Sequence, residues 1–258
     1  MQDYKKGFLM LLGLVLTYSS FSQVLIGGGD NQPPAQGQKK DKAQKRPKSI
    51  KPIDASTSFY LLTNWSSNHR SLEPNSTIFG DTLGDRANES AIGSWSFSIG
   101  LRNRISKHFS WDGGIAYARN GEQYEFDQAD TSYHYQTTYS YISMPLRLTV
   151  NYGKTVELFG GIGLMPQMFT GYKQDIQWRT TANTEFKETV KMKSGYAPNS
   201  FVLSALVNVG VCVHFEKNWS LLVSPELRYQ LTSTYAKQDE FIHKNRAIGI
   251  SFGLLRRL

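Results

Sequence analysis

The sequence predicts an all-β fold, and more narrowly an eight-stranded, antiparallel, up-and-down transmembrane β-barrel with extended external hairpins. Apolar and polar residues alternate with a period of two in one segment after another, and the connections between these segments are alternately short and long. After the N-terminal region, no stretch provides the roughly 20 uninterrupted apolar residues that a membrane-spanning helix needs, whereas a tilted barrel strand needs only about 9 to 11 residues. The pattern therefore favours strands with one lipid-facing side and one interior side.

The clearest alternation lies in residues 201–215 and 219–231, which a three-residue turn at 216–218 separates. Every odd position of the first segment is apolar, while its even positions carry a mixed set of side chains. The second segment has leucine, valine and tyrosine on one face and the charged residues Glu226 and Arg228 on the other. Together they predict a hairpin whose apolar face meets lipid and whose other face lines the barrel interior.

Six further segments with the same alternation bring the expected number of strands to eight, an even number that lets the barrel close without a free edge. They are residues 57–66, 92–106, 109–126, 133–152, a strand beginning at 156, and 247–256. Pro145 interrupts the fourth of the eight strands, and because proline cannot donate to the ladder it predicts a bulge or an edge-like irregularity there. Met144 is expected on the lipid-facing side of that strand.

The connections predict which ends of the strands lie together. Short connections are expected at 107–108, 153–155 and 216–218, and long ones at 67–91, 171–199 and 233–245. A hairpin capped near 127–132 and a second one at 186–193, which turns near 181–184, are expected to extend beyond the bilayer. Outer-membrane barrels have tight periplasmic turns and long external loops, so both chain ends are expected to be periplasmic.

Aromatic residues are expected to form two girdles at the membrane interfaces, where the rings of tryptophan and tyrosine are favoured. The girdle at the short turns comprises Phe109, Trp111, Tyr152, Phe215 and Trp219. The girdle nearer the long loops comprises Trp65, Trp95, Tyr139, Phe169, Tyr172, Phe201 and Tyr229.

The N-terminal region divides into two parts that precede the barrel at 57–258. Residues 1–22 have the layout of a secretory signal peptide, with Lys5 and Lys6 before an apolar run and small or polar residues near the expected cleavage site. Residues 23–56 are rich in glycine, glutamine, proline and lysine, which predicts a flexible periplasmic tether.

The tether carries much of the formal net charge of +8. Its basic residues are Lys39, Lys40, Lys42, Lys45, Arg46, Lys48 and Lys51, and Asp41 is the one acid among them. Because the signal peptide exports the chain, nucleic acid is not an expected partner. The basic run is either a solvated linker or a contact for an anionic surface or an acidic periplasmic partner.

Six charged residues fall on the interior face of the predicted strands: Arg102, Arg104, Arg147, Glu157, Glu226 and Arg228. An eight-stranded barrel is just wide enough for side chains to fill its interior. These residues are therefore expected to form a buried ion-pair network that plugs the lumen. A narrow gated channel is the alternative interpretation.

The sequence contains no phosphate-binding loop, zinc-ligand spacing or nucleophile elbow, so neither a metal nor a cofactor is expected. The single cysteine, Cys212, has no intramolecular disulfide partner and is expected to be a packed thiol. An outer-membrane lipid-modifying enzyme or protease would need a histidine near the external rim. The candidates are His69, His134 and His243, although histidines in solvated loops explain the same residues without catalysis.

Three segments carry a resemblance to the PorT-like family of small outer-membrane β-barrel domains: YISMPLRL at 141–148, ELRYQL at 226–231 and IGISFGL at 248–254. The resemblance spans roughly 57–258 and implies an eight-stranded barrel, and the family's namesake is an accessory of type IX secretion. The expected function is a non-enzymatic integral outer-membrane barrel of a Gram-negative bacterium, acting as an assembly or interaction subunit in protein secretion or envelope organisation. Expected partners are outer-membrane lipid, lipopolysaccharide, and a periplasmic or outer-membrane protein.

Overall fold

A computed structural model of the chain describes residues 56–74, 88–128, 131–182, 184–193, 199–215, 218–235 and 241–258. The predicted signal peptide (1–22) and almost all of the predicted tether (23–56), including its basic run at 39–51, lie outside the described residues. The described residues form eleven strands and no α-helix, and accordingly include no helix long and apolar enough to cross a bilayer.

The strands are β1 (Ser56–Pro74), β2 (Glu89–Ser90), β3 (Ile92–Arg104), β4 (Phe109–Asp127), β5 (Ser132–Ser143), β6 (Leu146–Gly153), β7 (Val156–Arg179), β8 (Glu185–Lys193), β9 (Phe201–His214), β10 (Trp219–Gln230) and β11 (Phe241–Arg257). Two of the predicted strands are longer than expected, because β1 continues eight residues beyond position 66 and β11 begins six residues before position 247.

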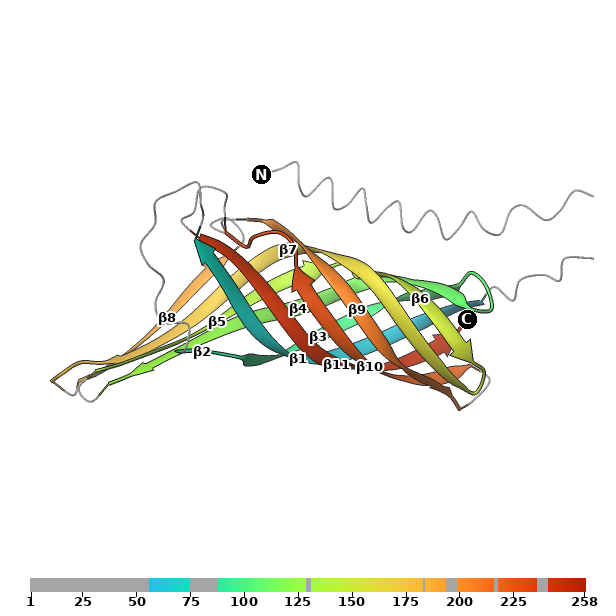
Figure 1. Ribbon diagram of the computed structural model, residues 1–258, viewed down its shortest axis with the longest axis horizontal. Coiled ribbons are helices and arrows are strands. Elements are labelled where there is room, and N and C mark those ends of the chain that lie inside the picture. The colour runs from blue at the N-terminus through green and yellow to red at the C-terminus, as the bar shows by residue number, and fades with distance from the viewer. Residues whose placement is uncertain are drawn as a thin grey trace, which may run out of the picture. The chain divides into compact units, whose positions relative to one another are not determined.

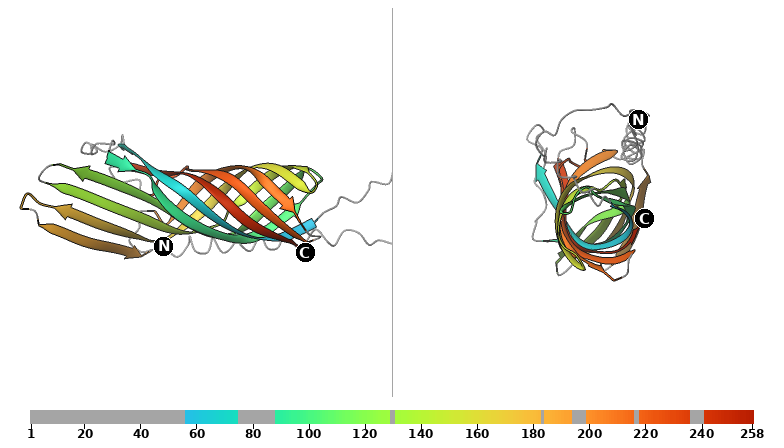
Figure 2. Two further views of the ribbon diagram at one scale, coloured as in Figure 1. Left: turned by 90° about the horizontal axis from the view of Figure 1, so that it is seen from below. Right: turned by 90° about the vertical axis from the view of Figure 1, so that its right-hand side faces the viewer.

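The pairing of these strands closes a ring, which confirms the predicted eight-stranded antiparallel barrel. β4, β3, β1, β11, β10, β9 and β7 follow one another as hydrogen-bonded neighbours. β5 and β6 are two parts of one strand, and both pair β4 on one side and β7 on the other. Because every strand of the ring has a partner on both sides, no free sheet edge remains around it, and the end-on view in Figure 2 shows the resulting circular outline.

The two ends of the barrel differ in their connections, as predicted. The connections β3 to β4, β6 to β7 and β9 to β10 are short and lie at one end, called the short-turn end below. The start of β1 and the end of β11 lie there too, since Ser58 pairs with Arg257 (Figure 1). The opposite end, called the long-loop end, carries the connections between the remaining ring strands.

Four strands continue past the ring at the long-loop end as a sheet, which is called the extension below. The strands of the extension lie side by side in the order β4, β5, β7 and β8 (Figure 2). At its tips, Asp127 lies opposite Ser132 and Arg179 lies opposite Glu185. The backbone N–H of Thr180 donates to the carbonyl oxygen of Thr184 at 3.1 Å and closes the turn. This confirms both the hairpin predicted at 186–193 and its turn.

Pro145 interrupts the strand, as predicted, since β5 ends at Ser143 and β6 begins at Leu146. No bulge lies there, because the register is unchanged across it, with Ser143 opposite Ala116 and Leu146 opposite Gly113. The register shift lies instead between Ser140 and Tyr141.

Ser143 and Met144 are both buried, so the alternation of buried and exposed side chains is broken next to Pro145. The Met144 backbone N–H donates to the carbonyl oxygen of Pro166 at 2.9 Å, and the Gly114 N–H donates to that of Pro145 at 3.3 Å. The prediction that Met144 faces lipid is wrong, because its side chain is only 1% exposed.

The outer face of the barrel is apolar and the inner face mostly polar. Among the described residues, most of the large apolar side chains left exposed lie at outward positions of the ring strands, and Ile162 (65% exposed), Ile248 (62%) and Val209 (58%) are examples. On the inner face, positions that alternate with these are buried although many are serine, asparagine or charged. An apolar exterior around a polar interior is the inverse of a soluble protein and is typical of a membrane-spanning barrel.

Only part of the predicted girdle at the long-loop end faces outward. Trp65, Trp95 and Phe201 are exposed on the outer face, as expected. Tyr139 and Phe169 are instead buried inside the barrel, at 7% and 3% exposure, so their assignment to the girdle is wrong. Both residues occupy inward positions in the alternating pattern of their own strands. An aromatic residue at the height of the membrane interface therefore need not face lipid.

A closely packed apolar cluster lies inside the barrel. Gly100 and Gly114 face each other across β3 and β4, and a Cβ atom on Gly100 would lie 2.5 Å from the hydroxyl oxygen of Tyr60. The glycines therefore leave the space that the Tyr60 side chain occupies. A buried apolar cluster surrounds this position and comprises Tyr60, Leu62, Phe159, Cys212, Leu222 and Leu255. Cys212 is a packed, free thiol in this cluster, as predicted.

Candidate functional site

The middle of the barrel interior holds one carboxylate between two arginines. Glu226 and Arg228 occupy successive inward positions of β10, and Arg147 reaches them from β6. The distances are 3.3 Å from Arg147 Nη2 to Glu226 Oε2 and 3.6 Å from Arg228 Nε to Glu226 Oε1. Arg228 Nη2 also donates to the hydroxyl of Ser66 at 2.7 Å. All three charged side chains are more than nine-tenths buried, so this group lies inside the barrel and away from solvent.

Two further ion pairs lie closer to the short-turn end. Arg102 on β3 makes a two-pronged contact with Asp112 on β4, with Nε and Nη2 each 2.8 Å from a carboxylate oxygen. Arg104, two residues along β3, contacts Glu157 at the start of β7. Asp112 was not included in the predicted network. It is the partner of Arg102 because the register of β3 and β4 places the two residues directly opposite each other.

The six predicted lumen residues are therefore all on the interior face, but they form separate groups. Arg147, Glu226 and Arg228 form the first, while Arg102 pairs with Asp112 and Arg104 with Glu157. The sequence pattern identified which side chains point inward. It did not identify which of them are partners, because that depends on the register between strands.

A fourth charged group lies inside the long-loop end, and its acidic residues and Arg70 were not predicted. His243 Nε2 lies 2.9 Å from Glu122 Oε2, and the Tyr139 hydroxyl donates to Glu122 Oε1 at 3.2 Å. Arg70 lies 3.5 Å from Glu122 and 2.9 Å from Glu89. We call Arg70, Glu89, Glu122, Tyr139 and His243 the upper cluster.

The expectation that His243 lies in a solvated loop is wrong, because this side chain is 1% exposed. Because β11 already begins at Phe241, His243 lies within a strand and its side chain points into the barrel. The ring of Tyr235 stacks on the His243 ring, with 4.9 Å between the ring centres. His134 lies in β5, 3.4 Å from the exposed carboxylate of Glu125, and His69 lies in β1. The three histidines thus have different surroundings among the described residues, and the structure does not bring them together in one site.

Glu122 lies beyond the apolar outer band, since the outward Arg119 on the same strand is exposed three residues before it. Burial raises the pKa of the Glu122 carboxyl, but the hydrogen bond to His243, the positive charges nearby and the hydrogen bond from Tyr139 outweigh burial and hold this pKa below its ordinary 4.5. The carboxylate is thus more favourable in the folded than in the unfolded chain. It stabilises the fold fully above pH 4.5, and this stabilisation is lost as the pH falls through the lowered pKa.

Glu122→Gln is therefore expected to lower the free energy of unfolding at pH 7 by about 2 to 3 kcal/mol, the size of a lost charge-assisted hydrogen bond. The difference from the unmodified protein should shrink when the pH falls below 4.5. Denaturant titrations in lipid vesicles across this pH range measure it. Glu125→Gln is the matched control, because the Glu125 side chain is 59% exposed. An equal, pH-independent loss in both variants would contradict the assignment.

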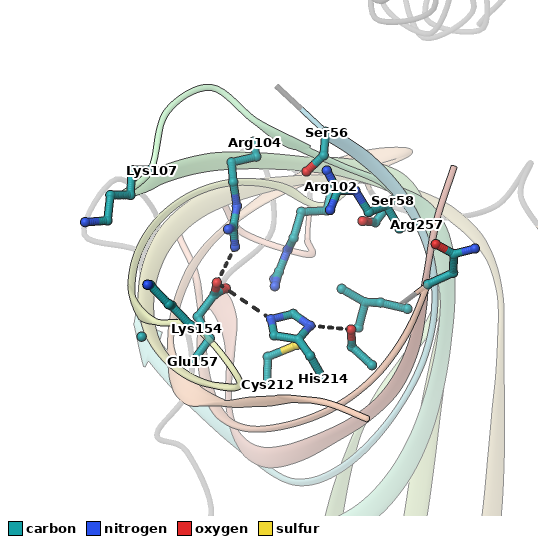
Figure 3. Close-up of a pocket in the computed structure, with 14 residues that line it drawn as sticks. Ser56, Ser58, Arg102, Arg104, Lys107, Lys154, Glu157, Cys212, His214 and Arg257 are labelled. Atoms are coloured by element: carbon teal, nitrogen blue, oxygen red, sulfur yellow. Dashed lines mark hydrogen bonds and ion pairs between the residues drawn. The ribbon is translucent and has the colours of Figure 1, made fainter. Parts of the chain in front are cut away.

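A cavity of about 440 Å³ opens at the short-turn end of the barrel. Its lining residues are Ser56, Ser58, Arg102, Arg104, Lys107, Gly153, Lys154, Glu157, Cys212, His214, Asn218, Ser220, Leu255 and Arg257. Figure 3 shows Arg104, Glu157 and His214 converging inside it, while Lys107 and Lys154 lie at one edge. The sequence did not indicate a cavity here, because residues of β1, β3, β7, β9, β10 and β11 contribute to it together.

The hydroxyl of Ser220 lies 2.5 Å from His214 Nδ1, and the other ring nitrogen, Nε2, lies 3.8 Å from Glu157 Oε2. The second distance is too long for a hydrogen bond, and Glu157 is already engaged by Arg104. This serine, histidine and glutamate therefore do not form the connected relay that a nucleophilic serine requires. What the cavity offers is positive charge and hydrogen-bond donors.

Fold and interior together define a class of protein: an antiparallel eight-stranded transmembrane barrel with an apolar exterior and an interior filled by paired charges. No protein-family model matches the chain, and no curated protein matches it.

Three solved structures illustrate the proteins to which this chain is similar. Neisserial surface protein A is 11% identical, with 78% of this chain and 97% of that chain covered and a TM-score of 0.38. The outer membrane protein OprG of Pseudomonas aeruginosa is 8% identical, with 78% and 95% covered and a TM-score of 0.38. The outer membrane protease OmpT of Escherichia coli is 10% identical, with 79% and 96% covered and a TM-score of 0.37. Because these values are low, the barrel assignment rests on this chain's own strand pairings.

Proposed function

We propose that the protein is a non-enzymatic integral outer-membrane β-barrel of a Gram-negative bacterium that acts as an assembly or interaction subunit. The observation that carries this proposal is the filled interior: Arg147, Glu226 and Arg228 occupy the middle of the lumen, each more than nine-tenths buried. A barrel of eight strands leaves no aqueous path once such side chains fill it. Its function then depends on its two ends, which are free to meet partners.

In the proposed orientation the short-turn end faces the periplasm and the extension faces outward, as is general for outer-membrane barrels. The start of β1 at Ser56 lies at the short-turn end, so the basic residues at 39–51 would be attached on the periplasmic side. Lipid and lipopolysaccharide would surround the apolar band. The resemblance to PorT-like domains supports a place in protein secretion of the type IX kind or in envelope organisation.

The orientation is tested by labelling intact cells with a membrane-impermeant maleimide. Cysteine is introduced at Ala182, in the turn between β7 and β8, or at Lys154, in the short turn between β6 and β7, and both positions are exposed. We expect labelling of Ala182→Cys in intact cells and of Lys154→Cys only after the envelope is opened. The native Cys212 is buried and provides the background measurement. Labelling of Lys154→Cys but not of Ala182→Cys in intact cells would show that the barrel has the opposite orientation.

The interaction role is tested by cross-linking in intact envelopes, followed by affinity capture of the barrel and identification of the attached proteins. A variant in which residues 39–51 are replaced by a glycine–serine segment of the same length keeps the reach of the tether and removes its charge. We expect a periplasmic or outer-membrane protein to be captured with the unmodified chain and lost with this variant. Unchanged capture would reject the tether as the contact for this partner.

A further inference from the structure

The cavity at the short-turn end, described above, carries an excess of positive charge. Five of its lining residues are lysine or arginine, whereas Glu157 is the one acidic lining residue. Asp112 neutralises Arg102 from outside the lining, and Glu157 neutralises Arg104. Lys107, Lys154 and Arg257 are all exposed at the mouth, and none of them forms an ion pair with another described residue. Their charges give this opening a positive potential.

Arg102 adds a buried donor that is not used within the protein. Its side chain is 8% exposed, and Nε and Nη2 are both taken by Asp112. The third nitrogen, Nη1, has no hydrogen-bond partner. Leaving such a buried donor unpaired is costly, and an arginine that uses one edge for a carboxylate still presents N–H groups on the other side. Figure 3 shows the Arg102 side chain reaching from β3 into the cavity.

The cavity already stabilises one carboxylate, which indicates the chemistry that it accepts. Glu157 is only 2% exposed, is contacted by Arg104 and lies 3.8 Å from His214. Serine hydroxyls and the Asn218 side chain surround the remaining space and can donate further hydrogen bonds. A volume of about 440 Å³ is within the range of small-ligand sites.

We propose that this cavity is a binding site for an oxyanion group, either a phosphate or the carboxylate of an acidic peptide, held by Arg102 and Arg104 and attracted by Lys107 and Lys154. The ligand enters through the mouth between the short turns. The geometry of the cavity alone supports the binding site. The further statement that its ligand comes from the periplasm rests on the proposed function.

The test is calorimetric titration of the purified full chain in a neutral detergent at low salt. Both ends of the barrel are accessible in detergent, so the result does not depend on the proposed orientation in the membrane. Inorganic phosphate is one probe. A tetraglutamate peptide with blocked ends is the second, and the corresponding tetraglutamine peptide is its uncharged match. We expect saturable binding of phosphate, of the acidic peptide, or of both, no binding of tetraglutamine, and weaker binding as salt is raised. The probe that binds identifies the source of the oxyanion, and absence of binding by both would overturn the proposal.

Two double variants with the same change in net charge locate the site. Lys107→Gln with Lys154→Gln removes charge at the mouth and is expected to weaken binding about three- to tenfold, the effect of two exposed charge interactions. Lys187→Gln with Lys191→Gln removes the same charge from β8, at the opposite end of the molecule, and should leave the affinity unchanged. Equal weakening by both variants would mean attraction by net charge alone and would reject the cavity as the site.

Glu157→Gln is a gain-of-binding variant. It removes the internal carboxylate that occupies Arg104, so the oxyanion should bind several-fold tighter. A purely structural role for these charges predicts no such gain. Heat-dependent migration of the barrel in denaturing gels verifies that each variant is folded, and weaker binding by folded Glu157→Gln would contradict the proposal.

Discussion

Glu226→Gln is expected to lower the free energy of unfolding of the barrel by about 3 to 5 kcal/mol, the cost of removing one partner from a buried ion pair. Glu226 is the carboxylate between Arg147 and Arg228, at 3.3 and 3.6 Å. Its loss leaves two buried guanidinium groups facing each other without a counter-charge. Denaturant titration of the protein in lipid vesicles, followed by tryptophan fluorescence, measures the change.

A compensated variant separates the loss of the charge balance from a general effect of substitution. Glu226→Gln combined with Arg147→Met and Arg228→Met leaves no unpaired charge, and apolar replacement of a whole buried ion group is often neutral or stabilising. We therefore expect the triple variant to recover most of the lost stability. If Glu226→Gln alone changes the free energy of unfolding by less than about 0.5 kcal/mol, as surface substitutions do, the lumen charges are not buried as described.

Phe159→Ala is expected to destabilise the barrel by a similar amount, about 3 to 5 kcal/mol, because it leaves a cavity in a packed cluster. The Phe159 side chain is 5% exposed and packs with Tyr60 and Leu222. It also lies beneath Arg102, whose guanidinium carbon is 5.1 Å from the ring centre. Substitution by alanine therefore removes both apolar contacts and a cation–π interaction.

Phe159→Leu is the matched variant, because it keeps much of the volume and should cost less than about 1.5 kcal/mol. The same vesicle titrations compare the two. Outward Phe252, 47% exposed, provides the control position, where Phe252→Leu retains an apolar side chain toward lipid and should change little. Equal losses for Phe159→Ala and Phe159→Leu would contradict the packing described for the interior.

The alternation of side chains predicted the barrel because membrane lipid and a narrow polar interior impose opposite requirements on successive residues. In β3, for example, it correctly placed Trp95 outside and Arg102 inside. It failed at Met144, whose side chain is buried next to the interruption of the strand at Pro145. It also indicated that the hairpins of the extension are too long for the bilayer, because the predicted strands around 127–132 exceed the length that a spanning strand needs.

The partners in the interior could not be predicted from the sequence, because they depend on the register and closure of the barrel. Arg102 meets Asp112 only because β3 and β4 align at that position. Glu122 and His243 lie 121 residues apart, in strands that are not neighbours in the ring, and they meet across the lumen. The cavity at the short-turn end likewise exists only when the ring is closed, so no local pattern indicated it.

The filled interior connects the fold with the proposed role. Paired charges occupy the middle of the lumen, the upper cluster occupies its long-loop end, and the remaining space opens toward the short turns as a cavity. Such a barrel is expected to act through the extension, the short-turn cavity and the tether. Transport through the lumen would require Arg147, Glu226 and Arg228 to move apart while staying inside a low-dielectric interior, which is unfavourable.

The most direct test is single-channel recording of the full chain in planar lipid bilayers, after flotation of proteoliposomes has verified insertion. A barrel whose lumen is closed by these side chains should give no stable conductance steps at moderate voltage. Stable, reproducible open events from the inserted, folded protein would contradict the account and would establish the narrow gated channel instead.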